Sequence, residues 1–246
     1  MPNDDRGAED LLGIDWRKAW LEYKYVRPIS DDPQAWDKRA GDYARNSGIS
    51  PYANTFINYL KPAQGASILD MGSGNGTLAL PLAHRGHSVL AADFSPRMLE
   101  MLQETATREG LSAAIHCMLL DFNAGWSVWE AAGITENCVD IAIASRSTMV
   151  DDLWAAFEKL ERAARLKVAV TVATEFSPRE TRRMGAVVDG SPPYIPAYIY
   201  AVNILMQMGR HPSVRYIDSD KTDEHGTTRL IRWAFISWDV SPKTQV

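Results

Sequence analysis

The stretch ILDMGSGNGTLALPLA at residues 68–83 constrains the fold more than any other part of this chain. Apolar residues typical of a strand end in Asp70, a tight glycine-rich loop from Gly72 to Gly76 follows, and helix-forming residues come next. Glycines permit positive φ angles and carry no Cβ, so the backbone of such a loop can approach a ligand closely. The N-terminus of the following helix offers unpaired N–H groups to a carboxylate or a phosphate. The stretch therefore predicts a strand–loop–helix unit that binds a ligand.

The spacing of the three glycines argues against two common nucleotide-binding loops. The pattern is G-x-G-x-G with Asp70 two positions before it, whereas the dinucleotide fingerprint is G-x-G-x-x-G. No Gly-Lys-Ser/Thr follows, so the loop is not a P-loop either. Asp93 ends the next apolar segment, where an acid can accept both hydroxyls of a ribose. Asp121-Phe122 ends the third apolar segment, where this pair can meet the amine and one face of an adenine.

Short apolar segments alternate with helical segments from residue 67 onward. This alternation predicts a parallel sheet with helices on both faces. After residue 176 the pattern changes to a Pro-rich loop, one apolar helix and two closing strands. The predicted strands are 67–72, 88–94, 114–122, 139–145, 167–176, 214–220 and 229–239, and the predicted helices lie near 77–85, 97–109, 127–132, 151–165 and 197–208.

Three further helices are predicted ahead of the sheet, at 11–25, 33–46 and 51–60. Ser50-Pro51 is typical of an N-cap followed by the first helical position, and Ser95-Pro96 opens a later helix in the same way. The first of the three helices carries an apolar stripe. This stripe packs on the main domain, covers a binding site or makes a homodimer contact; its members are Leu12, Trp16, Trp20 and Tyr23.

Composition and charge narrow the class of protein. Apolar residues make up 46% of the chain and charged residues 23%, as in ordinary globular proteins. No run reaches the roughly 18 apolar residues of a membrane span, so we expect no membrane partner. The first ten residues are acidic and lack an apolar segment, which is unlike a secretory signal, so we expect a cytoplasmic location. The net charge of −5 and the lack of a basic stripe predict no nucleic-acid partner.

Metal and disulfide chemistry receive no support from the sequence. The five histidines are scattered, and His84 and His87 have no third ligand nearby in the chain. Two cysteines cannot form a disulfide framework. We expect Cys117 and Cys138 to be core residues of the third and fourth strands.

Three segments together resemble the class I S-adenosylmethionine-dependent methyltransferases. They are DMGSGNG, AADFSPRML and LLDF, in the order and at the separations of that family, and the segment AWDKRAGDY is similar to small-molecule members of the quinone-biosynthesis type. The resemblance covers roughly residues 33–176. It implies an α/β fold with a Rossmann-like, seven-stranded, mostly parallel sheet of order 3-2-1-4-5-7-6, whose last strand is antiparallel. It also implies S-adenosylmethionine as cofactor and S-adenosylhomocysteine as product.

On this resemblance the chain is one methyltransferase domain with four parts. Residues 1–66 are an N-terminal helical cap, and residues 67–176 are the cofactor-binding core. Residues 177–212 are an insertion after the fifth strand, and residues 213–246 are the closing strands. The insertion either caps the site or supplies a helix that completes the layer on one face of the sheet.

The resemblance assigns the residues of the loop and of the second strand to the cofactor. Asp70 and the backbone of Gly72 would hold its amino group. Gly74 and Gly76 would let the chain pass close to the methionine portion, and Asp93 would hold the ribose diol. The residues implied in cofactor binding are Tyr43, Asp70, Gly72, Ser73, Gly74, Gly76, Asp93, Phe94, Met98, Asp121, Phe122 and Ser145.

The remaining implied roles concern the adenine. Phe94 and Met98 would line its pocket. Asp121 would bond its amine, and Phe122 would pack nearby.

The methyl group would lie beside Ser145 and Arg146, after the fourth strand. Tyr43 could place its ring near the sulfonium, since an aromatic face attracts a cation. We therefore take Tyr43 and Arg146 as catalytic candidates, although Tyr43 is also suited to packing between helices and Arg146 to a surface ion pair. If a general base is needed, Tyr43 and His211 are the candidates.

The expected acceptor is a small molecule enclosed by the cap. Methyltransferases of exocyclic base amines carry an Asn/Asp-Pro-Pro-aromatic stretch after strand four, where this chain has ASRSTM. The alternatives are a non-catalytic S-adenosylmethionine-binding regulatory module, a tRNA or protein methyltransferase and, more remotely, a Rossmann oxidoreductase. The side chains expected to line an apolar acceptor pocket are Trp16, Trp20, Trp36, Tyr43, Tyr52, Tyr194, Tyr198, Met206 and Met208.

Overall fold

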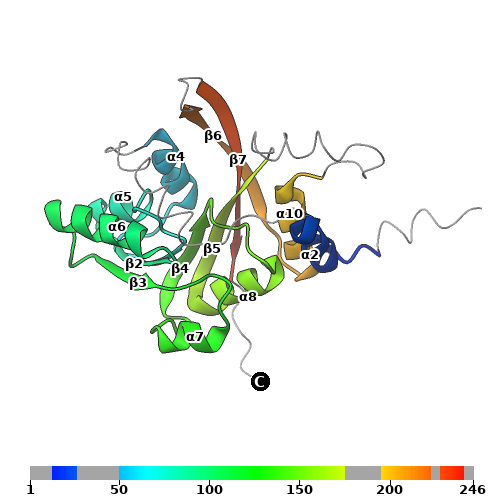
Figure 1. The fold of residues 1–246 in the computed structure, drawn as a ribbon, viewed down its shortest axis with the longest axis horizontal. Coiled ribbons are helices and arrows are strands. Elements are labelled where there is room, and N and C mark those ends of the chain that lie inside the picture. Colours follow the sequence, from blue (N-terminus) through cyan, green and yellow to red (C-terminus); the bar gives the residue numbers. More distant parts are fainter. Residues whose placement is uncertain (1–12, 27–49, 175–194, 223–227, 241–246) are drawn as a thin grey trace, which may run out of the picture.

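The computed structural model describes residues 13–26, 50–174, 195–222 and 228–240, and seven strands in these ranges form one sheet (Figure 1). β1 to β5 run parallel, whereas β7 is antiparallel to both β5 and β6. The order β3-β2-β1-β4-β5-β7-β6 confirms the prediction. The strands are β1 (Ser67–Met71), β2 (Ser88–Asp93), β3 (Ile115–Leu119), β4 (Val139–Ser145), β5 (Ala164–Ala173), β6 (Ser213–Thr222) and β7 (Thr228–Asp239).

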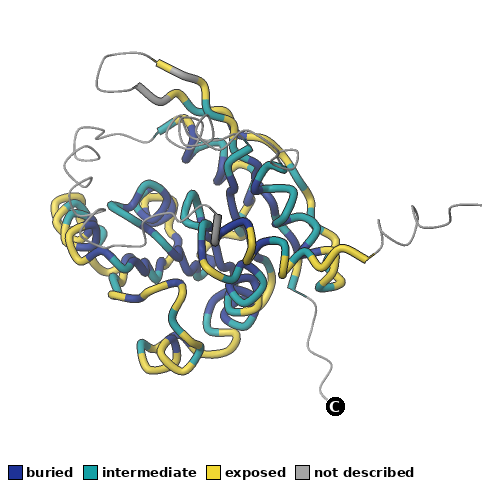
Figure 2. The backbone as a smooth tube through the Cα atoms, turned by 45° about the vertical axis from the view of Figure 1, so that its right-hand side comes forward, coloured by how far each residue is buried: buried dark blue, intermediate teal, exposed yellow. Residues whose placement is uncertain are grey.

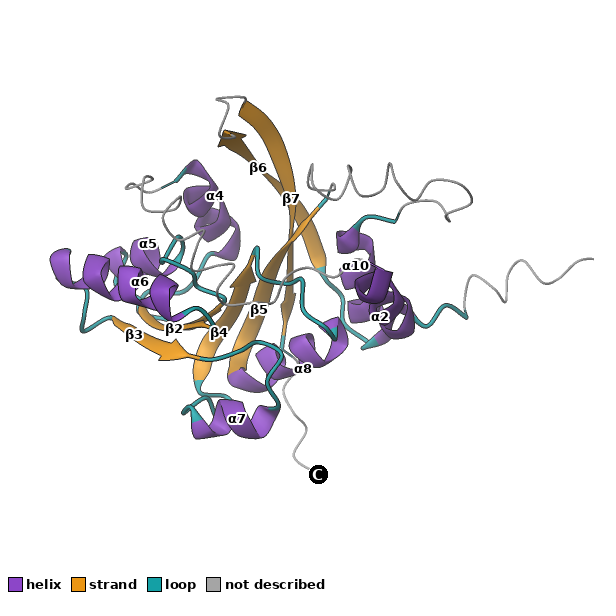
Figure 3. Ribbon diagram, in the orientation of Figure 1, coloured by secondary structure: helices purple, strands orange, loops and turns teal. Residues whose placement is uncertain are grey.

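Helices cover both faces of the sheet, as predicted (Figure 3). On one face α4, α5 and α6 contribute side chains to a core around Phe56 and Leu82. On the other face α2, α7, α8 and α10 enclose a core around Trp20, Trp129 and Phe157. The tube in Figure 2 shows the buried segments gathered inside the molecule, whereas β3 and β6 keep mostly exposed or half-buried residues. The helices are α2 (Trp16–Val26), α4 (Pro51–Leu60), α5 (Ala79–His84), α6 (Pro96–Arg108), α7 (Trp126–Ala131), α8 (Leu153–Ala163) and α10 (Ala197–Gln207).

Two predicted caps fix the helices that flank the site. The Oγ of Ser50 accepts a hydrogen bond from the N–H of Ala53 at 3.1 Å, and the Oγ of Ser95 accepts one from the N–H of Met98 at 3.2 Å. Each serine is followed by a proline in the first turn, whose fixed φ and missing N–H suit that position. Gly110, with φ of 71°, follows the end of α6 as the predicted stop.

Several strand ends differ from the prediction, and those of β3 and β5 differ most. β3 ends at Leu119 rather than Phe122, because the Asp121 carboxylate accepts from the N–H of Asn123 at 2.8 Å and begins a turn. β5 begins at Ala164, directly after α8, where the apolar pattern had predicted continued helix.

The cysteines also differ from the prediction. Cys117 lies in β3, but Cys138 lies just before β4, and both side chains are half-buried rather than fully in the core. Burial raises the pKa of both thiols. Both side chains therefore behave as modestly apolar packing groups at the edge of the core.

Aromatic rings join α2 to α10. Trp20 is fully buried, its ring centroid is 5.3 Å from that of Tyr23, and Tyr23 is 5.0 Å from Tyr200 of α10. Since α10 also packs on α8 and β5, it completes the layer on this face, which is one of the two alternatives for the insertion. Met206 is 61% exposed, which does not support its predicted place in an apolar pocket lining. The predicted helix 33–46 and the residues Trp36, Tyr43 and Tyr194 lie outside the described residues.

Two kinds of feature are absent from the described ranges. No helix there is both long and apolar enough to cross a membrane. No group of three or more His, Cys, Asp or Glu side chains in those ranges is placed to hold a metal ion.

Candidate active site

The glycine-rich loop lies where the strand order reverses, between β1 and β4. In open α/β sheets ligands bind beyond the carboxyl ends of the strands at this point. The N–H groups of Gly72 and Ser73 both donate to the carbonyl oxygen of Ala92, at 2.7 and 3.0 Å. Backbone hydrogen bonds therefore fix the loop to the end of β2.

The three glycines of the loop serve different purposes. A Cβ on Gly72 would lie 2.2 Å from the Cβ of Ser147, and a Cβ on Gly76 would lie 2.4 Å from Leu102. These two positions thus permit close packing inside the protein. Gly74, with φ of 54°, has no atom within 4 Å of the position that its Cβ would take. Of the three, Gly74 is the position open to the approach of a ligand.

Asp93 connects the loop to α6. The carboxylate is buried, and it accepts hydrogen bonds from the N–H of Gly74 at 2.8 Å and from the N–H of Ser95 at 2.9 Å. The side chain therefore shapes the loop, and its place at the end of β2 is the one predicted for an acid that binds a ribose.

Asp70 is the most perturbed acid of the site. Burial, with the nearby charge of Asp93, raises the pKa of Asp70 to about 7, against the lowering effects of Arg146 and of the N–H of Ala79. Its Oδ2 atom is buried and has no hydrogen-bond partner among the described residues, and the same is true of the Oγ of Ser73. Buried polar atoms without partners are rare in native proteins, so these two atoms indicate a polar ligand.

The residues predicted to contact the adenine differ in how deeply they are buried. Phe94 is half-buried and Met98 is buried, both at the turn from β2 into α6. Asp121 is exposed after β3, whereas the ring of Phe122 lies in the core, 5.9 Å from that of Trp129. Lys159 donates to the carbonyl oxygens of Phe122 and, at 2.8 Å, Ala124, which fixes this turn.

A polar and aromatic group gathers at the ends of β4 and β5. The Tyr52 hydroxyl forms hydrogen bonds with the Oγ of Ser145 at 2.7 Å and the Oγ1 of Thr171 at 2.8 Å. The Arg146 guanidinium lies over the Tyr52 ring, 4.4 Å from its centroid, and 6.0 Å from the Trp233 ring centroid. We call these five residues the β4-end cluster. Burial raises the pKa of the Tyr52 hydroxyl, so Tyr52 keeps its proton at neutral pH.

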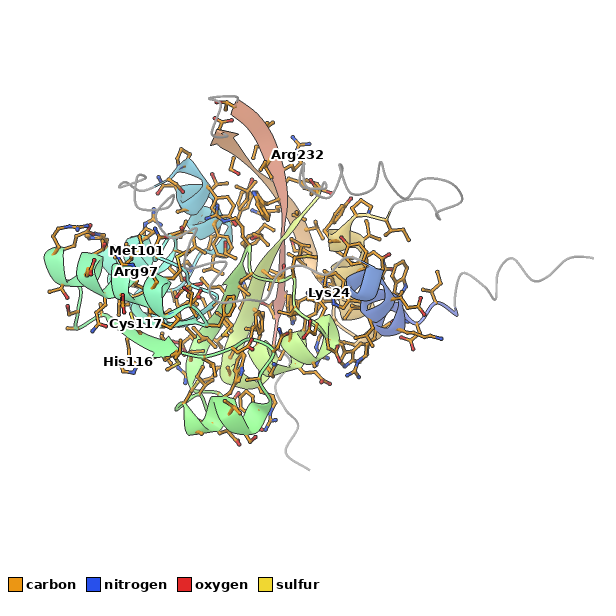
Figure 4. All side chains as sticks on the ribbon, viewed as in Figure 1. Lys24, Arg97, Met101, His116, Cys117 and Arg232 are labelled. Atoms are coloured by element: carbon orange, nitrogen blue, oxygen red, sulfur yellow. The ribbon has the colours of Figure 1, made fainter. Side chains whose placement is uncertain are left out.

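The loop that follows Arg146 is held by α2. Lys24 Nζ donates to the carbonyl oxygen of Met149 at 2.7 Å (Figure 4), and the Trp20 indole N–H donates to that of Val150 at 3.1 Å. Arg17, also in α2, forms an ion pair with Asp152, which is the N-cap residue of α8. The N-terminal helix therefore positions the segment next to the β4-end cluster.

The other predicted site residues are accounted for as follows. Tyr43 lies outside the described residues. His211 is exposed and precedes β6, whose first residue Ser213 pairs through Ser237 with Ala169 of β5. This register places His211 toward the amino end of β5, whereas the site lies at the carboxyl ends of the parallel strands. The prediction of His211 as a base is therefore wrong.

Comparison with known proteins identifies the family. The family described as "Methyltransferase domain" matches residues 68–167, from β1 into β5. An uncharacterized protein of Haemophilus influenzae is 31% identical over 191 residues, which cover 76% of this chain and 68% of that protein. The chain belongs to the class I S-adenosylmethionine-dependent methyltransferases.

Two further relatives extend this match. The ubiquinone biosynthesis O-methyltransferase of Albidiferax ferrireducens is 25% identical over 157 residues, 60% of this chain and 62% of that one. The chain thus spans about two thirds of the length of these curated relatives. The crystal structure of magnesium protoporphyrin IX methyltransferase from Synechocystis, with S-adenosylhomocysteine bound, has a TM-score of 0.56 at 16% identity and covers 91% of this chain and 94% of that one. That likeness confirms the fold.

The residues of this methyltransferase fit S-adenosylmethionine. The unpartnered Oδ2 of Asp70 suits an ammonium donor, the buried Asp93 carboxylate suits a ribose, and the open side of Gly74 leaves room between them. The individual assignments remain predictions.

Sequence reasoning missed how the β4-end cluster is assembled. Tyr52 was assigned only to a general pocket lining, and Thr171 and Trp233 to no site. Thr171 did carry a signal, because it is the lone hydroxyl in the apolar carboxyl-terminal half of β5, residues 168–173. Trp233 carried none, because only the pairing of β7 with β5 brings it to this edge.

Proposed function

We propose that this methyltransferase acts on a small organic molecule that binds beside Arg146 at the carboxyl ends of β4 and β5. The β4-end cluster carries the proposal, because it combines buried hydroxyls and a guanidinium with the aromatic rings of Tyr52 and Trp233. A few convergent polar groups among aromatic walls are typical of small-molecule sites.

Two further observations support this acceptor class. The protein from Albidiferax is named for ubiquinone biosynthesis and the one from Synechocystis for magnesium protoporphyrin IX, and both names refer to small organic molecules. The net charge of −5 does not suit the many phosphate contacts of a nucleic-acid substrate. The cytoplasm is the location that we propose, because free cysteines such as Cys117 and Cys138 suit a reducing compartment.

In this reaction the protein mainly aligns the cofactor with the acceptor. S-adenosylmethionine, when bound, supplies a methyl group on a sulfonium that is already a good leaving group. Asp70 and Asp93 would hold its two ends, while Ser145 and Arg146 orient the acceptor on the neighbouring strand end. Correct orientation alone can account for much of the lowering of a barrier. Because Tyr52 stays protonated, it fixes Ser145 and Thr171 in place rather than acting as a base.

The test measures S-adenosylhomocysteine formation by the purified protein with panels of phenols, amines, thiols and carboxylic acids. Total tRNA and protein extract serve as the macromolecular comparison. We expect turnover with at least one small molecule. Methylation of tRNA or protein without any small-molecule turnover would show that the proposed acceptor class is wrong. Tight S-adenosylhomocysteine binding without turnover on any acceptor would favour the regulatory alternative.

A further inference from the structure

Arg146 occupies an unusual backbone position at the end of β4. Its φ is 60°, in the left-handed region that residues with a Cβ seldom adopt. Its N–H donates to the Oγ1 of Thr171 at 3.0 Å, which holds this conformation. Strained backbone of this kind is retained mainly at ligand-binding and catalytic sites.

The guanidinium of Arg146 lies over two aromatic rings. It is 4.4 Å from the ring centroid of Tyr52, which is itself buried and fixed by two hydrogen bonds. The Trp233 ring lies further out, at 6.0 Å from the same guanidinium. These cation–π contacts hold the guanidinium without using its N–H donors.

Those edges have no partner in the part of the chain that the structure describes. There Arg146 makes its backbone hydrogen bond and its two ring contacts, but no side-chain hydrogen bond or ion pair. Asp70, in the adjacent strand β1, is near enough for Arg146 to lower its pKa, but among the described residues the two form no ion pair within 4.0 Å. A half-buried guanidinium without an ion pair is suited to a planar anion.

We propose that the methyl acceptor carries a carboxylate, and that Arg146 binds this carboxylate through its N–H edge. The inference rests on the proposed function, because it names the substrate class of the same site. A bidentate pair would occupy the carboxylate oxygens, so the methyl group would go to another nucleophile of the same molecule. The bond from sulfur to the methyl carbon breaks, S-adenosylhomocysteine leaves, and the proton of the nucleophile passes to solvent. Trp233 and the rim of Tyr52 then suit a flat or apolar body attached to the acid.

The test uses acid and amide pairs of the same shape, measured by calorimetry on protein saturated with S-adenosylhomocysteine. The pairs are benzoate and benzamide, phenylacetate and phenylacetamide, and indole-3-acetate and indole-3-acetamide. At least one acid should bind about tenfold more tightly than its amide, as one charge-assisted pair predicts.

Two variants locate this preference. Arg146→Asn keeps a residue that tolerates left-handed backbone and should abolish the acid preference. Arg146→Lys keeps the charge but loses the planar fork, so it should retain only part of the preference. Arg146→Lys, which keeps the positive charge that lowers the pKa of Asp70, should bind S-adenosylhomocysteine within about threefold of the wild type, because Arg146 is assigned here to the acceptor.

The outcomes separate this inference from the function on which it rests. Wild-type protein that fails to bind S-adenosylhomocysteine would refute the methyltransferase proposal itself. Wild-type protein that binds it but shows no acid preference at up to about 10 mM ligand would overturn only the carboxylate proposal. A large loss of S-adenosylhomocysteine affinity in the charge-conserving Arg146→Lys would also overturn it, since Arg146 would then serve the cofactor.

Discussion

The cofactor half and the acceptor half of this active site are built in different ways. The cofactor half consists of Asp70, loop 72–76 and Asp93, which lie within two successive strands and the loop between them. The acceptor half is the β4-end cluster, whose members come from α4, β4, β5 and β7. Backbone hydrogen bonds to Ala92 fix the first, whereas hydroxyls and stacked rings fix the second.

This difference predicts how each half responds to change. A loop fixed by its backbone and by missing Cβ atoms has no room to adjust, so substitutions there should have abrupt effects. A cluster of side chains can lose one contact and keep the others, so substitutions there should have graded effects. The predictions below test this contrast, beginning with the largest effect.

Gly72→Ala should be the most damaging single substitution. The new Cβ would lie 2.2 Å from that of Ser147, at a φ of 75° that disfavours any side chain. Overpacking and left-handed strain together should lower the free energy of unfolding by roughly 3 kcal/mol or more. Denaturant unfolding measures this change.

Gly65 and Gly74 supply matched controls for Gly72. Gly65 has a φ of 73° and open space around its missing Cβ, so Gly65→Ala isolates the backbone strain, about 1–2 kcal/mol. Gly74→Ala should be as mild for stability but should weaken S-adenosylhomocysteine binding, because the added Cβ enters the open side of the loop. Equal losses of stability for Gly65→Ala and Gly72→Ala would show that contact with Ser147 does not constrain the loop.

Asp93→Ala should cost at least tenfold in affinity for S-adenosylhomocysteine. It removes the acceptor of the Gly74 and Ser95 N–H groups and both predicted acceptors of the ribose. A charge-assisted hydrogen bond is worth about 1.5–3 kcal/mol, or roughly ten- to a hundredfold in affinity. Calorimetry measures the change, and Asp93→Asn, which keeps one oxygen, should be intermediate. Unchanged binding by a folded Asp93→Ala protein would refute the assignment.

Binding of S-adenosylhomocysteine should strengthen with pH. Burial, with the charge of Asp93, raises the pKa of Asp70 to about 7, and an ammonium ligand requires the ionised carboxylate. Affinity should therefore rise by about tenfold between pH 6 and pH 8. 5′-Methylthioadenosine, which lacks the amino-acid portion, should show no such rise, and Asp70→Asn should remove it. A flat profile for S-adenosylhomocysteine would place its amino group elsewhere.

The same pKa shift predicts the opposite trend for stability without ligand. The folded-state pKa of Asp70 lies above its unfolded value, so the protonated acid favours the fold. This contribution is fully present below about pH 4 and is lost as the pH rises through about 7. In Asp70→Asn that part of the pH dependence of thermal unfolding should disappear.

The same contrast explains what the sequence could predict. Strand β1, its loop and the caps at Ser50 and Ser95 were predicted because their causes lie within a few residues. The sequence leaves the role of α10 open, because an apolar helix fits a core layer and a cap equally well until its neighbours are known. The cluster around Arg146 was found only in part, because strand order, rather than spacing along the chain, brings Tyr52 and Trp233 to it.

Lys24→Met should give the smallest effect, and one confined to the acceptor half. Lys24 is 8% exposed and donates to the carbonyl oxygen of Met149, so methionine would fill the same space but leave that oxygen without its donor. The cost should be about 1 kcal/mol, or about 2–4 °C in Tm. Loosening of the loop after Arg146 should raise the KM of the acceptor a few-fold while affinity for S-adenosylhomocysteine stays unchanged. Lys18→Met, at an exposed position of the same helix, is the control and should change neither quantity. A fall in S-adenosylhomocysteine affinity as large as the change in acceptor KM would mean that α2 supports both halves, and the contrast between them would fail.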